Sequence, residues 1–79
     1  MEFILTFGSV HRVLKAEGIL KEAGVAFRLM PTPKALEKVC DLVILTGEGE
    51  LFAAKDALFD AGLPPRNIYR REGDDCVKV

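Results

Sequence analysis

Apolar residues recur along this chain with two different periods, and these periods predict its elements. Two short segments, Phe-Ile-Leu-Thr-Phe near the start and Leu-Val-Ile-Leu in the middle, are almost continuously apolar, as expected for central strands. Two longer segments repeat apolar positions at helical spacing, and a glycine follows each. The apolar face predicted for the first segment is Val13, Ala16, Leu20 and Ala23, and for the second Leu51, Ala54, Ala57, Leu58 and Ala61. The predicted strands are residues 3–7, 25–30, 41–46 and 67–71, and the predicted helices are residues 10–23 and 50–61. Gly73 and two aspartates predict a turn into an optional short strand at residues 76–79.

The order of these elements is β-α-β-β-α-β, which predicts the ferredoxin-like fold of the α+β class. We expect residues 1–79 to form a single domain. Its four-stranded antiparallel sheet would have the spatial order 4-1-3-2, and both helices would pack on one face. This order makes the two most apolar strands the central ones, so the hydrophobic pattern and the topology agree.

Three connections of the predicted fold meet at one end of the sheet. The first strand leads into a helix that begins near Ser9, a predicted N-cap residue. The connection at residues 31–40 and the turn at residues 62–66 reach the same end. We therefore expect Cys40, Ser9 and His11 to lie together near the amino end of the first helix.

Composition narrows the function classes. The chain has 79 residues, 49% of them hydrophobic, and a formal net charge of −1 with interspersed charges. This charge pattern predicts neither a nucleic-acid surface nor a membrane surface. Two cysteines, Cys40 and Cys76, are too few for a disulfide framework or a zinc finger, and free thiols are typical of a reducing cytoplasm. We expect a cytoplasmic protein without a metal, and interpret Cys76, near the end of the chain and without basic company, as structural.

Cys40 is the candidate for chemistry because it stands in a short connection just before an apolar run. The reactive form of a cysteine is the thiolate, which needs exposure and nearby positive potential. The amino end of the first helix, His11 and Arg28 would supply that potential. The alternative is that Cys40 is a small buried hydrophobic residue, His11 a polar first-turn residue and Arg28 a solvated charge on an edge strand.

A family resemblance adds to this interpretation. The segment Phe27-Arg-Leu-Met-Pro-Thr-Pro-Lys34, followed by Cys40, resembles the signature of the selenium/sulfur carrier-like family, and Ser9-Val-His11 resembles that family's helix opening. The resemblance covers the chain from Phe3 to about Tyr69. It implies that Cys40 carries a persulfide or perselenide between a donor protein and an acceptor protein.

The resemblance also implies roles for the surrounding residues. His11 or Arg28 would stabilise the sulfur anion, and the motif residues would support the loop. These supporting residues are Ser9, Pro31, Thr32, Pro33 and Lys34. Neither a metal nor an organic cofactor is needed for such a relay. We expect no independent enzymatic turnover, because the sequence shows no set of nucleophile, base and orienting group.

Two differences separate this chain from the family pattern. Asp41 follows Cys40 where the family typically has glycine, and a neighbouring carboxylate raises the pKa of a thiol. Glu37 and Lys38 replace hydroxyl residues that could hydrogen-bond the sulfur. The chain is therefore interpreted as a divergent member with altered chemistry.

Phe52 and Phe59 support a competing hypothesis. They lie seven residues apart on the flank of the second predicted helix, away from its apolar face. They would form a contact surface for a second copy of the chain or another protein, unless residues 76–79 fold back over them. The alternatives to a sulfur carrier are thus a non-catalytic interaction or dimerisation module and, with less support, a domain that senses a small metabolite.

Overall fold

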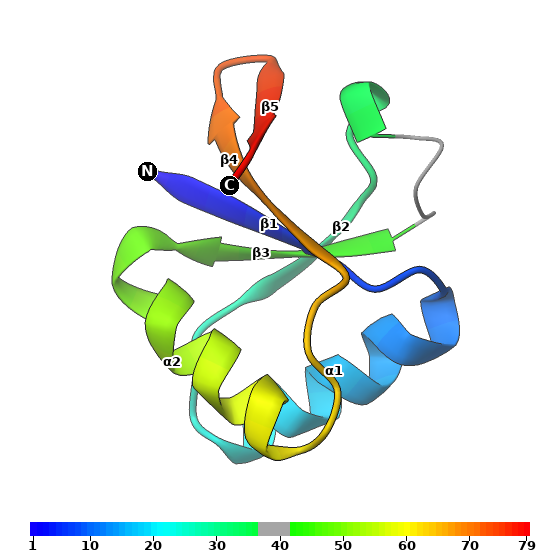
Figure 1. Ribbon diagram of the computed structural model, residues 1–79, viewed down its shortest axis with the longest axis vertical. Helices are drawn as coiled ribbons and strands as arrows, with labels where there is room; N and C mark the ends of the chain where they lie inside the picture. The colour runs from blue at the N-terminus through cyan, green and yellow to red at the C-terminus, as the bar shows by residue number, and fades with distance from the viewer. Residues whose placement is uncertain (37–41) are drawn as a thin grey trace.

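The computed structural model describes residues 1–36 and 42–79. Its elements are β1 (Glu2–Thr6), α1 (Val10–Glu22), β2 (Arg28–Pro31), the 3₁₀ helix η1 (Lys34–Leu36), β3 (Leu42–Gly47), α2 (Glu48–Asp60), β4 (Asn67–Glu72) and β5 (Asp75–Lys78) (Figure 1). The predicted order of strands and helices is confirmed for the first six major elements. The predicted start of the third strand, at residue 41, lies outside the described residues.

The sheet has the order β2-β3-β1-β4-β5, and every neighbouring pair is antiparallel. The first four strands have the predicted order, but the sheet has five strands rather than four, so that prediction is corrected. The fifth strand forms because Glu72 pairs with Asp75 across a two-residue turn. Gly73, the first residue of that turn, has a φ of 61°, a conformation that glycine adopts readily.

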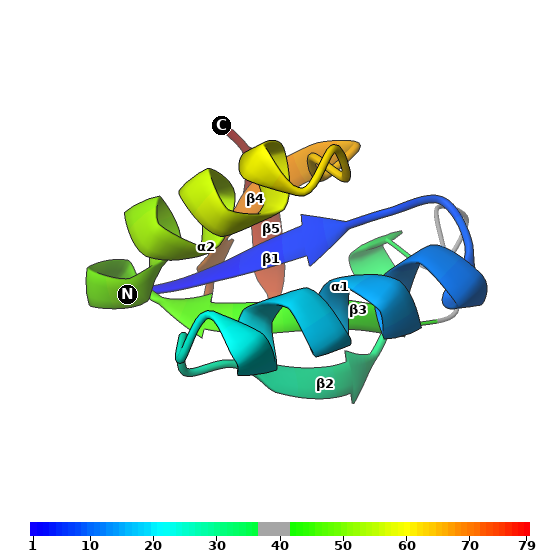
Figure 2. The same cartoon turned by 90° about the horizontal axis from the view of Figure 1, so that it is seen from below.

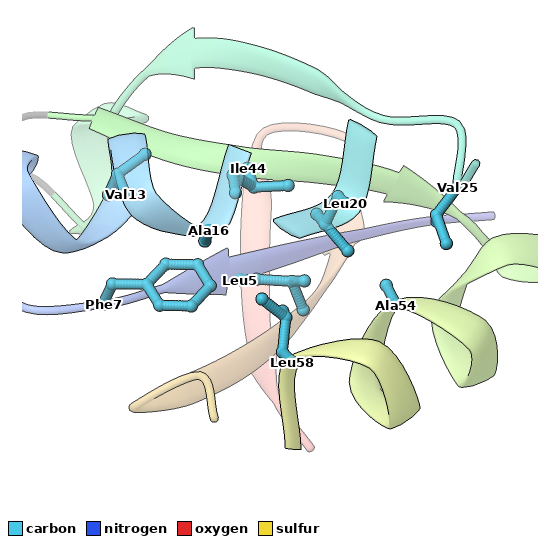
Figure 3. Packing of buried hydrophobic residues seen from close by; sticks show 9 residues of the cluster. All are labelled: Leu5, Phe7, Val13, Ala16, Leu20, Val25, Ile44, Ala54 and Leu58. Atoms are coloured by element: carbon cyan, nitrogen blue, oxygen red, sulfur yellow. The ribbon is translucent and has the colours of Figure 1, made fainter. Parts of the chain in front are cut away.

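Both long helices cover one face of the sheet, as predicted (Figures 1 and 2). Figure 3 shows the core between them, with Leu5 and Ile44 of the central strands facing Leu20 of α1 and Leu58 of α2. These four side chains have no exposed surface. The continuous apolar runs of β1 and β3 are thus explained by burial on this face and on the opposite one.

The opposite face of the sheet carries a second, smaller apolar cluster. Side chains alternate between the faces of a strand, so Ile4, Val43 and Leu45 point away from the helices. Leu36 of η1 is buried against them, with Met30, Tyr69 and Cys76 packed at the margin. The short helix therefore covers part of the face that α1 and α2 leave open.

The helical patterns predicted the buried sides of both helices well. In α1, Val13, Ala16 and Leu20 are buried, but Ala23, predicted on the same face, is exposed at the C-cap. In α2, Ala54 and Leu58 are buried, but Ala61, which was expected in the core, is exposed because the helix ends at Asp60. Within the described part of the chain, no helix is both long and apolar enough to cross a membrane.

Candidate functional site

The candidate site begins where β1 turns into α1. Gly8 has a φ of 84°, and Ser9 follows in an extended conformation as the N-cap of α1. The Ser9 Oγ accepts a hydrogen bond from the backbone N–H of Arg12 at 3.2 Å. This bond satisfies one of the backbone donors that the first turn of a helix leaves free, so the predicted N-cap is confirmed.

The connection between α2 and β4 lies beside this turn. The backbone N–H of Arg66 donates to the carbonyl oxygen of Thr6 at 2.6 Å, which ties the connection to the end of β1. The guanidinium of Arg66 then lies against Gly8, where an added Cβ would be 3.1 Å from Nη1. Glycine at position 8 thus serves both the backbone turn and the close approach of an arginine.

These two connections enclose an open cavity of about 480 Å³. Its lining residues are Phe7, Gly8, Ser9, Arg12, Pro64, Pro65 and Arg66. Among the residues that the structure describes, neither arginine has a carboxylate within ion-pair distance, and the first turn of α1 contains no acidic residue. Two cationic groups and the amino end of a helix therefore give this cavity positive potential.

Of the site residues predicted from the sequence, Ser9 lines the cavity, and His11 follows Ser9 by two positions in the chain. His11 is exposed on the first turn of α1 but does not line the cavity. Arg28 is on the other face of the sheet, because it pairs directly with Leu45, whose side chain belongs to the second cluster. The structure therefore brings Ser9 and His11 to one end and separates Arg28 from them.

Sequence reasoning missed Arg12 and Arg66. Arg12 immediately follows His11, so a helix opening rich in cations was visible in the sequence. Arg66 closes the turn that was expected at this end, and its place in that turn was the available signal. The contact with Gly8 could not be seen, because the two residues are distant in the chain.

The proline motif lies at the edge of the sheet. Pro31 ends the edge strand β2 opposite Leu42 of β3, where a residue without a backbone N–H is tolerated. Lys34 opens η1, and the Leu36 N–H donates to the Pro33 carbonyl at 2.8 Å. The Thr32 Oγ1 is buried and has no hydrogen-bond partner within residues 1–36 and 42–79.

Cys40 and its neighbours Glu37, Lys38, Val39 and Asp41 lie outside the described residues. The role predicted for Cys40, and the effect predicted for Asp41, stay predictions. Both views show that the start of β3 lies at the same end of the molecule as the start of α1 (Figures 1 and 2). Leu42, the first residue of β3, is two positions after Cys40 in the sequence.

Cys76 has surroundings that the sequence analysis did not foresee. It is half-buried at the margin of the second cluster, and it pairs across the strands with Arg71. Burial raises the pKa of the Cys76 thiol, Arg71 lowers it and Asp75 raises it, and the net direction is upward. The expectation that no basic residue accompanies Cys76 is therefore wrong, although burial outweighs the arginine.

Phe52 and Phe59 on α2 are 81% and 71% exposed. The C-terminal segment does not cover them, because β5 pairs with β4 and the Val79 N–H donates to the Ile68 carbonyl. The alternative that residues 76–79 fold back over these two rings is therefore wrong. Elsewhere in the described residues, no group of three or more His, Cys, Asp or Glu side chains could hold a metal ion.

Most of this chain matches one known protein family. The sequence model of one protein family, described as "Putative Se/S carrier protein-like", matches residues 2–70. The matched region includes the cavity, the proline motif and both helices. Neither a comparison with curated proteins nor one with solved structures found a significant match.

Proposed function

Because this chain belongs to the Se/S carrier protein-like family, we propose that it carries sulfur or selenium on Cys40 between a donor protein and an acceptor protein. The family match over residues 2–70 is the observation that carries the proposal. The ferredoxin-like arrangement of β1 to β4 with two helices on one face is the scaffold that we propose for this role. We also propose that the protein works in the cytoplasm, where thiols stay reduced.

The proposed step is a transfer of sulfane sulfur. The Cys40 thiolate attacks the outer sulfur of a donor persulfide, a new S–S bond forms, and the S–S bond of the donor breaks. The donor leaves as a thiolate, so no external oxidant or reductant is required. A thiolate of the acceptor then takes the outer sulfur from Cys40 in the same way. A donor perselenide would deliver selenium by the corresponding exchange.

The cavity beside α1 supports this chemistry. The attacking thiolate, the persulfide on Cys40 and the departing thiolate are all anions, and an anion is stabilised by nearby cations. Arg12 and Arg66 face the cavity and have no ion-pair partner among the described residues. We therefore assign to these arginines the stabilising role that the sequence suggested for His11 and Arg28, with His11 close by.

The decisive experiment measures loading by intact mass. The protein is incubated with a cysteine desulfurase and cysteine, and the gain of sulfur is recorded for wild type, Cys40→Ser and Cys76→Ser. Wild type and Cys76→Ser are expected to gain sulfur, and Cys40→Ser is expected to gain none. Cys76 is a matched control because it is a second thiol in the same chain, with a raised pKa. Equal loading of Cys40→Ser, or no loading of wild type, would exclude the proposal.

A second experiment tests the cavity. In the Arg12→Ala/Arg66→Ala variant, loading of Cys40 is expected to slow by about two- to thirtyfold, the range that two partly solvated charge interactions give. Arg70→Ala is the control, since it also removes a cation but one that pairs with Glu72 on β4. Equal rates for both variants would show that the cavity has no part in the transfer.

A further inference from the structure

The outer side of α2 presents two aromatic rings that the proposed sulfur transfer does not use. Phe52 and Phe59 are 81% and 71% exposed, whereas the most exposed large hydrophobic side chain of α1, Leu14, is 50% exposed. With Lys55 and Asp56 the rings line a hollow of about 160 Å³. These four residues are at positions i, i+3, i+4 and i+7 of one helix, the spacing of a hole that accepts a side chain from a facing helix.

The charges beside the rings select the occupant. At 3.6 residues per turn, Lys55 lies roughly 50° to one side of the line from Phe52 to Phe59, and Asp56 lies roughly 50° to the other. Between the two rings, one flank of the aromatic line thus carries a cation, Lys55, and the other an anion, Asp56. Such a surface is complementary to the same surface on a second copy. The two copies must be oriented so that Lys55 of each one faces Asp56 of the other.

Only one symmetric arrangement achieves this pairing. If the two-fold axis runs along the helices, both α2 helices point the same way and each Lys55 faces Asp56 of the second copy on both flanks. If the helices are antiparallel, Lys55 of one copy faces Lys55 of the other, and the two Asp56 side chains face each other. Glu48, one turn before Phe52, is on the Lys55 flank, so in the parallel arrangement it lies opposite the flank of Gly49.

We therefore propose that two copies of this chain associate through α2, side by side and parallel, with Phe52 and Phe59 in the centre and reciprocal Lys55–Asp56 ion pairs at the flanks. The inference is independent of sulfur transfer on Cys40. A phenylalanine supplies about 150–250 Å² when it is buried, so four rings provide roughly half of the area of a standard interface. The dimer is consequently reversible and concentration-dependent.

Sedimentation equilibrium over a range of protein concentrations tests the proposal. Wild type is expected to dimerise, and Phe52→Asp and Phe59→Asp are each expected to raise the dissociation constant at least tenfold. Leu14→Asp is the matched control, because it makes the same kind of change at the exposed side of α1. Circular dichroism confirms that each variant is folded. A wild type that stays monomeric at millimolar concentration would overturn the proposed dimer.

Charge reversal tests the orientation. Lys55→Asp or Asp56→Lys alone turns both attractive pairs into repulsive ones, so each is expected to weaken the dimer by about two- to thirtyfold. The double variant Lys55→Asp/Asp56→Lys restores the pairs and is expected to dimerise like wild type. An antiparallel dimer has like charges opposed in all four proteins, so equal dissociation constants throughout would overturn the parallel arrangement.

Discussion

The two long helices have equal length and pack on the same sheet face, but their amino ends differ. α1 begins with a serine cap and has no carboxylate in its first turn, while α2 begins at Gly47 without a side-chain cap and carries Glu48 and Glu50 there. Each helix follows a central strand, and β1 and β3 are antiparallel, so the two amino ends lie at opposite ends of the sheet. Among the described residues, the amino end of α1 is therefore flanked by the cations Arg12 and Arg66, and the first turn of α2 carries carboxylates.

Of these two helix amino ends, that of α1 is the better suited to the anionic sulfur group of the proposed transfer. The free N–H groups of a first turn attract a negative charge, and carboxylates in that turn satisfy the attraction internally. At α2 the two glutamates supply this negative charge. The first turn of α1 has no carboxylate, so its free N–H groups can attract a negative charge from outside the helix. The positive charges of Arg12 and Arg66 strengthen this attraction. The contrast lies in charge and capping, because the buried sides of the two helices are alike.

Glycines near the two amino ends give the sharpest test of the contrast. Gly8→Ala is expected to lower the free energy of unfolding by about 1–2 kcal/mol, since alanine is strained at a φ of 84° and its Cβ would press on Arg66. Gly49→Ala in α2 is expected to raise it by up to about 1 kcal/mol, because no atom lies within 4 Å of the new Cβ. Urea unfolding monitored by circular dichroism measures both.

A double variant separates the two causes at Gly8. In Gly8→Ala/Arg66→Ala the contact with the guanidinium is gone, but the strain of the positive φ remains. Most of the loss in stability should therefore persist in the double variant. Full recovery of stability would show that the arginine, not the backbone, requires glycine here. Equal losses for Gly8→Ala and Gly49→Ala would show that the chain has the same need for glycine near both helix amino ends.

The hydrophobic pattern of the sequence predicted much of this fold. The continuous runs predicted that β1 and β3 are central, and the helical spacing identified Val13, Ala16 and Leu20 as the buried side of α1. The fifth strand was only an optional prediction, because a short, exposed strand such as β5 has little apolar pattern of its own. Its pairing with β4 depends on a local turn at Gly73 rather than on burial.

The candidate site was less predictable, for reasons that can be named. Ser9 was identified because N-capping is a local property of the sequence. Arg66 was missed because its contact with Gly8 joins two distant connections. Arg28 was named as a source of positive potential without a predicted sheet face, because the face of a side chain depends on strand register, which the sequence did not provide. Sequence pattern thus fixes elements well, but it does not fix which side chains from different connections meet.

Substitutions at the N-cap positions of the two helices are expected to change the free energy of unfolding by a smaller amount. Ser9→Ala removes the acceptor for the Arg12 N–H and is expected to lower the free energy of unfolding by about 1 kcal/mol, whereas Ser9→Gly should cost only a few tenths. Gly47→Ser adds a potential cap to α2 and is expected to gain a few tenths of a kcal/mol. Unchanged stability of Ser9→Ala in thermal unfolding would show that the serine cap contributes little.

The smallest effect concerns the second thiol, which lies away from both helix ends. Burial raises the pKa of Cys76 above its ordinary value despite Arg71, so the folded protein holds the thiol proton more tightly than the unfolded chain does. The associated stability is complete below the ordinary thiol pKa of about 8.5 and is lost as the pH rises through the folded value. In the Cys40→Ser background, alkylation of Cys76 should therefore require a higher pH than alkylation of a free cysteine. The stability of that protein should also fall more steeply above the ordinary thiol pKa than that of Cys40→Ser/Cys76→Ala. An alkylation midpoint at or below that of free cysteine would mean that Arg71 outweighs burial at this thiol.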